Sequence, residues 1–139
     1  MPEYTPYPVE LITPEGIAFS GDAERLIVPG AAGELGIFAN HAPLVSLLQP
    51  GETRLTDADG TVRRYATDDG YVQVRQNRAV VLVGEAVPVE SIDAAAAARR
   101  LDEAQGALER AEGGDGDVHA ARREVGFAEA LVKTAKGTG

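Results

Sequence analysis

Residues 33–44 read Gly-Glu-Leu-Gly-Ile-Phe-Ala-Asn-His-Ala-Pro-Leu. The two glycines permit backbone angles that other residues avoid. Pro43 fixes its own backbone and pushes Ala42 towards an extended conformation. We therefore expect a short strand, a sharp loop and a return strand, with Glu34 and His41 displayed near the bends. Residues displayed in this way contact partners more often than they carry chemistry.

The segments on either side of this stretch are short, and turn residues separate them. The expected strands occupy residues 9–12, 17–20, 25–28, 44–48, 53–56, 61–65, 70–75 and 79–83. We expect Gly-Asp at residues 21–22 and Gln-Asn at residues 76–77 to turn the chain, and residues 57–60, which end in glycine, to close a hairpin. The segment 79–83 is apolar on both faces, which favours a central strand. Many short strands at close spacing predict a β-sandwich or barrel.

The pattern changes at Pro88, after which the sequence becomes rich in alanine. Asp93 offers an N-cap to a first helix, residues 113–116 break it, and Asp117 can cap a second. Apolar residues recur in both helices at spacings of three and four, so that each has one apolar stripe. The stripes are Ala94, Ala97, Leu101, Ala104, Leu108 and Ala111 in the first helix, and Val118, Ala121, Val125, Ala128, Val132 and Ala135 in the second. Two such helices joined by a short turn predict an antiparallel hairpin.

The sequence therefore predicts a mainly β protein with an α appendage, divided into residues 1–88 and residues 89–139. The helical stripes are mostly alanine, which buries far less area than leucine. Gly106 and Gly126 each cost about 1 kcal/mol relative to alanine inside a helix. We expect the helical hairpin to be marginal on its own and to open when a partner offers a better surface.

Composition excludes several classes of function. The net charge of −9 argues against a nucleic-acid partner. The chain has no cysteine, so it has neither a disulfide framework nor a thiolate metal site, and we expect no metal. The first residues lack the basic and apolar regions of a secretory signal. No apolar run approaches the roughly 18 residues of a membrane-spanning helix, so we expect no direct membrane insertion.

Catalytic motifs are absent from the sequence. It contains two histidines, His41 and His119, and no metalloprotease, nucleophile-elbow or phosphate-loop pattern. Asp68-Asp69 could form a carboxylate pair for acid–base chemistry, but a solvated turn is the simpler interpretation. The arginine pairs at residues 99–100 and 122–123 could bind phosphate, although each is typical of the polar face of an amphipathic helix.

Three short motifs together resemble the epsilon subunit of the bacterial F-type, proton-translocating ATP synthase. They are residues 33–37, Gly-Glu-Leu-Gly-Ile, residues 41–44, His-Ala-Pro-Leu, and the Pro-Gly at residues 50–51. The resemblance continues through residues 19–21 and 70–74 and the final helical hairpin, and so covers nearly the whole chain. It implies a ten-stranded β-sandwich followed by a two-helix hairpin, with no active site in this subunit.

The resemblance also implies partners and a location. The sandwich is expected to bind the gamma subunit and the membrane c-ring, as part of the rotor's central stalk at the cytoplasmic face of the bacterial plasma membrane. The helices are expected either to fold down on the sandwich, or to extend into the catalytic head of alpha and beta subunits and inhibit ATP hydrolysis. The matching contact positions are Glu34, Leu35, Gly36, Ile37, His41, Ala42 and Pro43.

One departure from the family pattern concerns nucleotide binding. Relatives that bind ATP carry Ile/Leu-Asp-x-x-Arg-Ala at the start of the first helix, whereas here Ala96 replaces the arginine and Glu129 replaces a second basic residue. Because a polyphosphate needs several cations, we expect only weak ATP binding and no bound cofactor. The candidate nucleotide-binding residues are Ile92, Asp93, Arg99 and Arg122, with Arg100 as a further cation.

Two alternatives remain open at the level of sequence. One is a β-sandwich interaction module with a helical tail, which works in another complex and does not associate with gamma or c subunits. The other is a small enzyme that uses His41 with Asp68 or Asp69, for which we expect turnover to depend on the pKa of a histidine.

Overall fold

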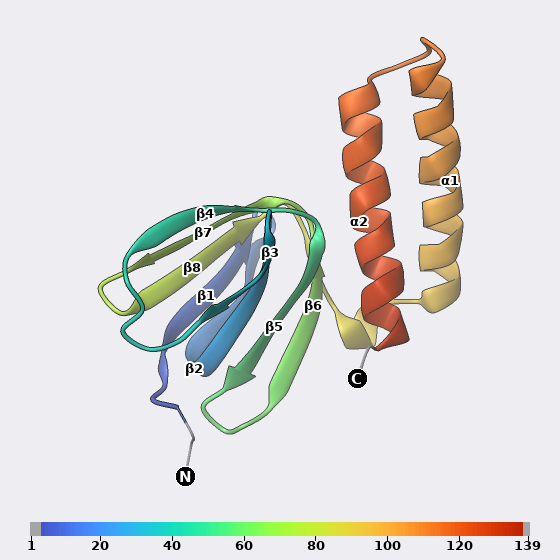
Figure 1. Cartoon of the computed structure of the whole chain (residues 1–139). Helices are drawn as coiled ribbons and strands as arrows, with labels where there is room; N and C mark the ends of the chain where they lie inside the picture. Colours follow the sequence, from blue (N-terminus) through green and yellow to red (C-terminus); the bar gives the residue numbers. More distant parts are fainter. Residues whose placement is uncertain (1–3, 138–139) are drawn as a thin grey trace.

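The computed structural model describes residues 4–137 and shows a β-sandwich with two helices packed on one side (Figure 1). The strands are β1 Tyr7–Thr13, β2 Gly16–Gly30, β3 Gly33–Ile37, β4 Leu44–Leu48, β5 Gly51–Asp57, β6 Val62–Thr67, β7 Gly70–Arg75, β8 Arg78–Val83 and β9 Ala86–Pro88. A short 3-10 helix, η1 Val89–Ser91, leads to the helices α1 Ala94–Glu112 and α2 Val118–Lys136. The mainly β architecture followed by two helices confirms the fold expected from the sequence.

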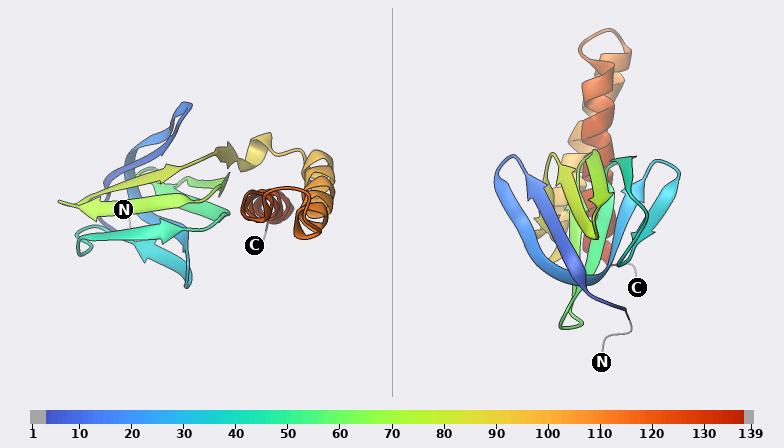
Figure 2. Two further views of the ribbon diagram at one scale, coloured as in Figure 1. Left: turned by 90° about the horizontal axis from the view of Figure 1, so that it is seen from above. Right: turned by 90° about the vertical axis from the view of Figure 1, so that its left-hand side faces the viewer.

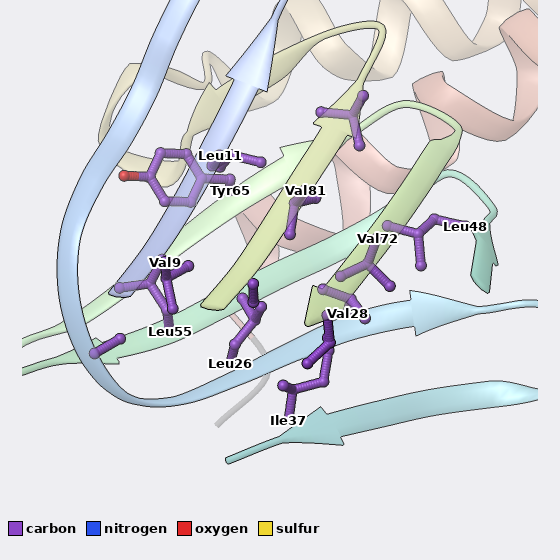
Figure 3. Close-up of a cluster of buried hydrophobic side chains, with 14 of the residues drawn as sticks. Val9, Leu11, Leu26, Val28, Ile37, Leu48, Leu55, Tyr65, Val72 and Val81 are labelled. Atoms are coloured by element: carbon purple, nitrogen blue, oxygen red, sulfur yellow. The ribbon is translucent and has the colours of Figure 1, made fainter. Parts of the chain in front are cut away.

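Strand β2 differs from the expectation, because it runs unbroken over Gly16–Gly30 and does not turn at residues 21–22. Its first half pairs with β1, and its second half pairs with β3 and β5. The register with β5 shifts between Ala23 and Arg25, and such a bulge bends a strand without ending it. Figure 3 shows β2 curving around the core. Residues 4–137 contain nine strands in place of the ten implied by the resemblance. Two of the segments expected from the sequence are joined in β2, and β9 was not among the expected segments.

The core lies between the two layers formed by the strand order β1-β8-β7-β4-β2-β5-β6-β9, with β3 added along β2 (Figure 3). Alternate residues of each strand point inward, as the period of a pleated strand requires. The buried residues include Val9, Leu11, Leu26, Val28, Leu55, Val72, Val74 and Val81. The buried Tyr7 hydroxyl donates a hydrogen bond to the carbonyl oxygen of Ile37 at 2.7 Å, and burial raises its pKa. This bond ties β1 to the end of β3.

Two turns expected from the sequence are confirmed. The Asp57 carboxylate accepts hydrogen bonds from the backbone N–H groups of Asp59 and Thr61, each at 3.0 Å, and closes the β5–β6 hairpin. Gln76 and Asn77 have φ angles of 50° and 59°, which form the tight turn between β7 and β8. Strand β8 pairs with β1 on one side and β7 on the other, as expected of a central strand.

Both helices begin at the residues that the sequence indicated. The Asp93 carboxylate accepts the backbone N–H of Ala96 at 3.0 Å, and Asp117 accepts that of Ala120 at 3.1 Å. These are N-cap bonds, which satisfy donors left free at the start of a helix. The chain turns at residues 113–117, and the two helices run antiparallel.

Helix α2 lies between α1 and the sandwich (Figure 2), and therefore buries two faces. Of its expected stripe, only Ala128 is fully buried, and the other members are half-buried. A second face of α2 packs against β6 and contains Phe127, Ala130 and Leu131, all buried. The single apolar stripe expected for α2 does not include this face.

Candidate functional site

Residues 33–44 form strand β3, a loop and the start of β4, as expected. Among the described residues, strand β3 pairs with β2 alone, so its other edge is open. The side chain of Glu34 is 56% exposed at the start of β3, and Arg54 of β5 donates two hydrogen bonds to its carboxylate at 2.6 and 3.2 Å. These bonds hold the pKa of Glu34 below its ordinary value and raise the pKa of Arg54. The exposed edge thus carries a fixed, charged carboxylate.

The Glu34–Arg54 ion pair predicts a measurable titration. The side-chain carbon of Glu34, followed by NMR, is expected to titrate below the ordinary value of 4.5, because Arg54 favours the charged form. The stabilisation from the pair is therefore present above pH 4.5 and disappears as the pH falls through the lowered pKa. Arg54→Gln is expected to raise the midpoint towards the ordinary value, because the hydrogen bonds and the charge that favour the carboxylate are removed. A midpoint that stays low in that variant would contradict the assigned cause.

The other residues expected at this surface divide into exposed and structural positions. Leu35 is half-buried and packs against the core, whereas Gly36 is exposed. Ile37 is completely buried in the core. In this conformation Ile37 therefore positions the strand and cannot itself contact a partner.

The loop after β3 is fastened by hydrogen bonds to its surroundings. The Asn40 backbone N–H donates to the side-chain oxygen of Asn77 at 2.6 Å, and Asn40 has a φ of 61°. The His41 ring lies with Nδ1 at 2.8 Å from the carbonyl oxygen of Ala42. Since a carbonyl oxygen only accepts, Nδ1 carries the proton in this bond. Ala42 and Pro43 are exposed, so the loop presents a defined surface.

The structure places Glu34 and His41 at opposite ends of β3, along one edge of the sandwich. It also separates His41 from Asp68. His41 precedes Leu44 at the start of β4, and Asp68 precedes Gly70, which pairs with the last residue of β4. Strand β4 alone spans about 13 Å at roughly 3.3 Å per residue. The arrangement therefore does not support a catalytic pair of His41 with Asp68.

The neighbouring carboxylates at residues 68–69 form a turn. The Asp68 carboxylate accepts the backbone N–H of Asp69 at 2.8 Å, and the backbone N–H of Gly84 donates to the carbonyl oxygen of Asp69 at 3.1 Å. Burial raises the pKa of Asp68. These bonds join the β6–β7 connection to the end of β8, which agrees with the turn interpretation made from the sequence.

An apolar surface that was not expected from the sequence lies on the outer face of β4, β7 and β8. Its most exposed members are Leu47 at 73%, Val45 at 69% and Tyr71 at 41%. Leu47 lies opposite Tyr71, which lies opposite the half-buried Leu82, so these side chains form a continuous row across three strands. The signal in the sequence is the segment 44–48, which is apolar at outward as well as inward positions. Exposed apolar rows of this kind mark contact surfaces.

The candidate nucleotide-binding residues are not brought together. The Asp93 carboxylate is engaged in capping α1, and Ile92 packs against the cluster around Phe127. Arg99 lines an open groove of about 470 Å³ on the hairpin. Arg122 lies 3.6 Å from Glu112, at the other end of α1 from Asp93. A helix of 19 residues spans about 28 Å, so Arg122 and Asp93 cannot hold the same nucleotide in this conformation.

The further cation Arg100 is also occupied. Its guanidinium donates to the Glu124 carboxylate at 2.7 Å and lies 5.0 Å from the centre of the Phe127 ring. The bond to Glu124 raises the pKa of Arg100. Arg100 therefore contributes to joining α1 and α2, and the groove beside it also carries the carboxylates of Glu103 and Glu124.

Comparison with known proteins shows to which protein family the chain belongs. Residues 7–89, which span the sandwich from the start of β1 to just beyond β9, match the family described as ATP synthase, Delta/Epsilon chain, beta-sandwich domain. The chain belongs to this family. Within the family, the ATP synthase epsilon chain of Campylobacter fetus subsp. fetus is 39% identical over 108 residues, which cover 78% of this chain and 84% of that protein. The epsilon chain of Rubrobacter xylanophilus is 34% identical over 134 residues, covering 93% and 91% of the two chains.

Solved structures share the fold of this delta/epsilon chain. A chain in the mitochondrial ATP synthase of Euglena gracilis, in a structure of OSCP, F1 and c-ring, superposes with a TM-score of 0.73 at 22% identity, covering 88% of this chain and 77% of that one. A chain in the central stalk and c-ring structure from Tetrahymena thermophila has a TM-score of 0.64 at 15% identity, covering 95% and 98%. These chains therefore share the fold although their sequence identity to this chain is low.

Two kinds of feature are absent from residues 4–137. None of the described helices is long and apolar enough to cross a membrane. The described residues hold no group of three or more histidine, cysteine or acidic side chains that could bind a metal ion.

Proposed function

We propose that this chain is a non-catalytic rotor subunit of a proton-translocating ATP synthase, and that it couples c-ring rotation to ATP synthesis in the catalytic head. The observation that carries the proposal is the family match over the whole sandwich, together with epsilon-chain relatives that align along most of the chain. A rotor joint transmits torque, which favours a rigid element with a continuous core. The buried core of this sandwich meets that requirement.

The two exposed surfaces of the sandwich support different contacts. The apolar row on β4, β7 and β8 suits a lasting contact with the gamma subunit, since burying such side chains is favourable. The open edge of β3 and the loop 38–43 display two polar groups, the Glu34 carboxylate and the His41 ring. We assign this edge to the c-ring. The complex would then hold the chain at the cytoplasmic face of the bacterial plasma membrane, without a membrane-spanning segment of its own.

The helical hairpin supports a regulatory role in the same complex. In this structure it is folded down on the sandwich through one face of α2. Its α1–α2 contact is built mainly on alanines, which suits an element with a second, extended arrangement. We propose that the extended helices contact the catalytic alpha and beta subunits and inhibit ATP hydrolysis. The separated cations Arg99 and Arg122 support weak ATP binding only, with no bound cofactor.

Binding to the gamma subunit tests the proposal directly. The full chain is expected to bind purified gamma, and Leu47→Ser is expected to weaken that binding about tenfold or more, because a buried leucine contributes roughly 1.5–3 kcal/mol. The unfolding midpoint is expected to change little, since Leu47 is 73% exposed in the free chain.

Val62→Ser is the matched control for this experiment. Val62 is 55% exposed on β6, away from the apolar row, so its replacement is expected to leave gamma binding unchanged. Equal losses in the two variants would refute the assignment of the surface. Failure of the folded full chain to bind gamma at all would favour an interaction module of another complex.

A further inference from the structure

A row of alternating charges crosses the outer face of the sandwich from β3 to helix α2. Glu34 pairs with Arg54 at 2.6 Å, and Arg54 lies 3.8 Å from Glu52. Glu52 in turn accepts two hydrogen bonds from Arg64, at 2.7 and 3.1 Å. Arg64 also donates to the carbonyl oxygen of Thr134 in α2, at 3.1 Å. We call these four charged side chains, Glu34, Arg54, Glu52 and Arg64, the charge row.

Acidic and basic side chains alternate along the charge row, and this alternation offsets the repulsion between its two arginines. Arg54 and Arg64 lie directly opposite each other in the β5–β6 register, where two like charges repel. Glu52 lies two residues before Arg54 on the same face of β5 and contacts both arginines. Glu34 neutralises Arg54 from the other side. Each acidic member therefore determines where the neighbouring arginine points.

At its far end the charge row holds the last turn of α2. The Thr134 carbonyl lies in the last turn of the helix, where the helix dipole is negative. It accepts the backbone N–H of Gly137 at 3.1 Å, and its second lone pair accepts the hydrogen bond from Arg64. A guanidinium at this end of the helix is favourable, because it donates to a carbonyl of the last turn and is attracted by the negative end of the helix dipole. Arg64 is the member with this position, and its side chain is only 21% exposed. Its direction is fixed by the paired bonds to Glu52.

We propose that the charge row couples the open edge of β3 to the docking of α2. A cationic side chain of a partner that binds the Glu34 carboxylate displaces Arg54 from it. Arg54 then pairs more closely with Glu52, which already lies 3.8 Å away. Because Glu52 then pairs with both arginines, its bonds to Arg64 weaken and the Arg64 side chain is less firmly oriented. The hydrogen bond from Arg64 to the Thr134 carbonyl weakens as a result. Occupation of the β3 edge thereby favours release of the helices. The identity of that partner as the c-ring rests on the proposed function, whereas the coupling itself lies within this chain.

The coupling is tested on the isolated full chain by amide hydrogen exchange, which reports local opening. Glu34→Gln is expected to speed exchange in residues 130–137 about twofold to fivefold, the range for one partly exposed ion pair. Glu15→Gln, at an exposed carboxylate in the β1–β2 turn, is the matched control and is expected to change nothing there. Amides in the core strands serve as the internal reference for intact folding in every variant.

A double-mutant cycle separates coupling from independent effects. Arg64→Gln alone is expected to speed exchange in residues 130–137 at least as much as Glu34→Gln does. In the Arg64→Gln background, Glu34→Gln is expected to have no further effect, because the row is already interrupted. Normal exchange in Glu34→Gln, or an unchanged effect of Glu34→Gln in the Arg64→Gln background, overturns the proposal.

A second arm uses a purified c-ring as the probe. Where the ring binds the wild-type chain, faster exchange in residues 130–137 supports the proposed direction, and unchanged exchange refutes it. Where the ring does not bind, the assignment of the β3 edge fails, and the result on the isolated chain still decides whether the charge row couples β3 to α2.

Discussion

Replacing Phe127 with alanine is expected to release both helices from the sandwich while the sandwich stays folded. Phe127 is 1% exposed and is the largest side chain in the cluster that joins α2 to the sheet. Truncating a buried phenylalanine costs about 3–5 kcal/mol. The rest of that cluster consists mainly of alanines with Leu131, so little apolar area is left to keep the helices docked.

The measurement is limited proteolysis together with amide exchange in residues 94–136. Rapid cleavage of the helices, with protected core strands, is the expected result. Leu108→Ala is the matched control, because Leu108 is half-buried in α1 near the turn between the helices. It is expected to loosen the hairpin internally and to leave the docked end of α2 protected. Full protection of the helices in Phe127→Ala would show that the docking does not depend on this ring.

The same variant links docking to the proposed regulation. If the folded-down hairpin is the non-inhibiting state, weakening its dock shifts the population towards the extended state. ATP hydrolysis by a complex that contains Phe127→Ala is then expected to be slower than with the wild-type chain. Equal hydrolysis rates, with the helices shown to be released, would argue against inhibition by the helices.

Replacing Gly70 with alanine is expected to have the largest effect on the sandwich itself. Gly70 begins β7 between β4 and β8, and a Cβ at this position would lie 1.9 Å from the carbonyl oxygen of Leu82 and 2.7 Å from the Cα of Val83. Both neighbours are backbone atoms, which cannot swing aside as a side chain can. Overpacking of this kind costs about 3 kcal/mol or more. Thermal unfolding is expected to begin more than about 10 °C earlier.

Gly106→Ala is the matched control, since it makes the same change in a helix. The added Cβ would lie 3.5 Å from a guanidinium nitrogen of Arg110, which is an ordinary contact. Alanine is favoured over glycine in a helix interior by about 1 kcal/mol, so this variant is expected to protect the hairpin slightly. A wild-type unfolding midpoint in Gly70→Ala would contradict the close approach of β7 and β8.

Several features of the fold could be predicted because they depend on neighbours in the sequence. Asp93 and Asp117 cap the helices through bonds to residues only three positions away. The β5–β6 and β7–β8 turns follow from the residues within them. The strand, loop and return strand at residues 33–44 follow likewise from glycine and proline. The motif-based resemblance to epsilon subunits is confirmed by the family match.

Other features could not be predicted from the residues nearby in the sequence. Gly21-Asp22 is a common turn pair, yet β2 continues through it, because β1 and β5 supply pairing partners on both sides of the bend. Phe127 lies off the expected stripe of α2 and is buried, because the sandwich offers a second surface to that helix. Nothing in the spacing of apolar residues within one helix reveals that it packs against two neighbours.

By itself, the sequence determined the β-rich first part, the paired helices and their boundaries, and the motif by which the family is recognised. Each of these rests on backbone preferences and on side-chain periods within a few residues. Only the tertiary structure decided that Glu34 meets Arg54 and that Arg64 reaches Thr134, across separations of 20 and 70 residues. Such contacts leave no local period, because they depend on which strand faces which neighbour after the chain has closed around its core.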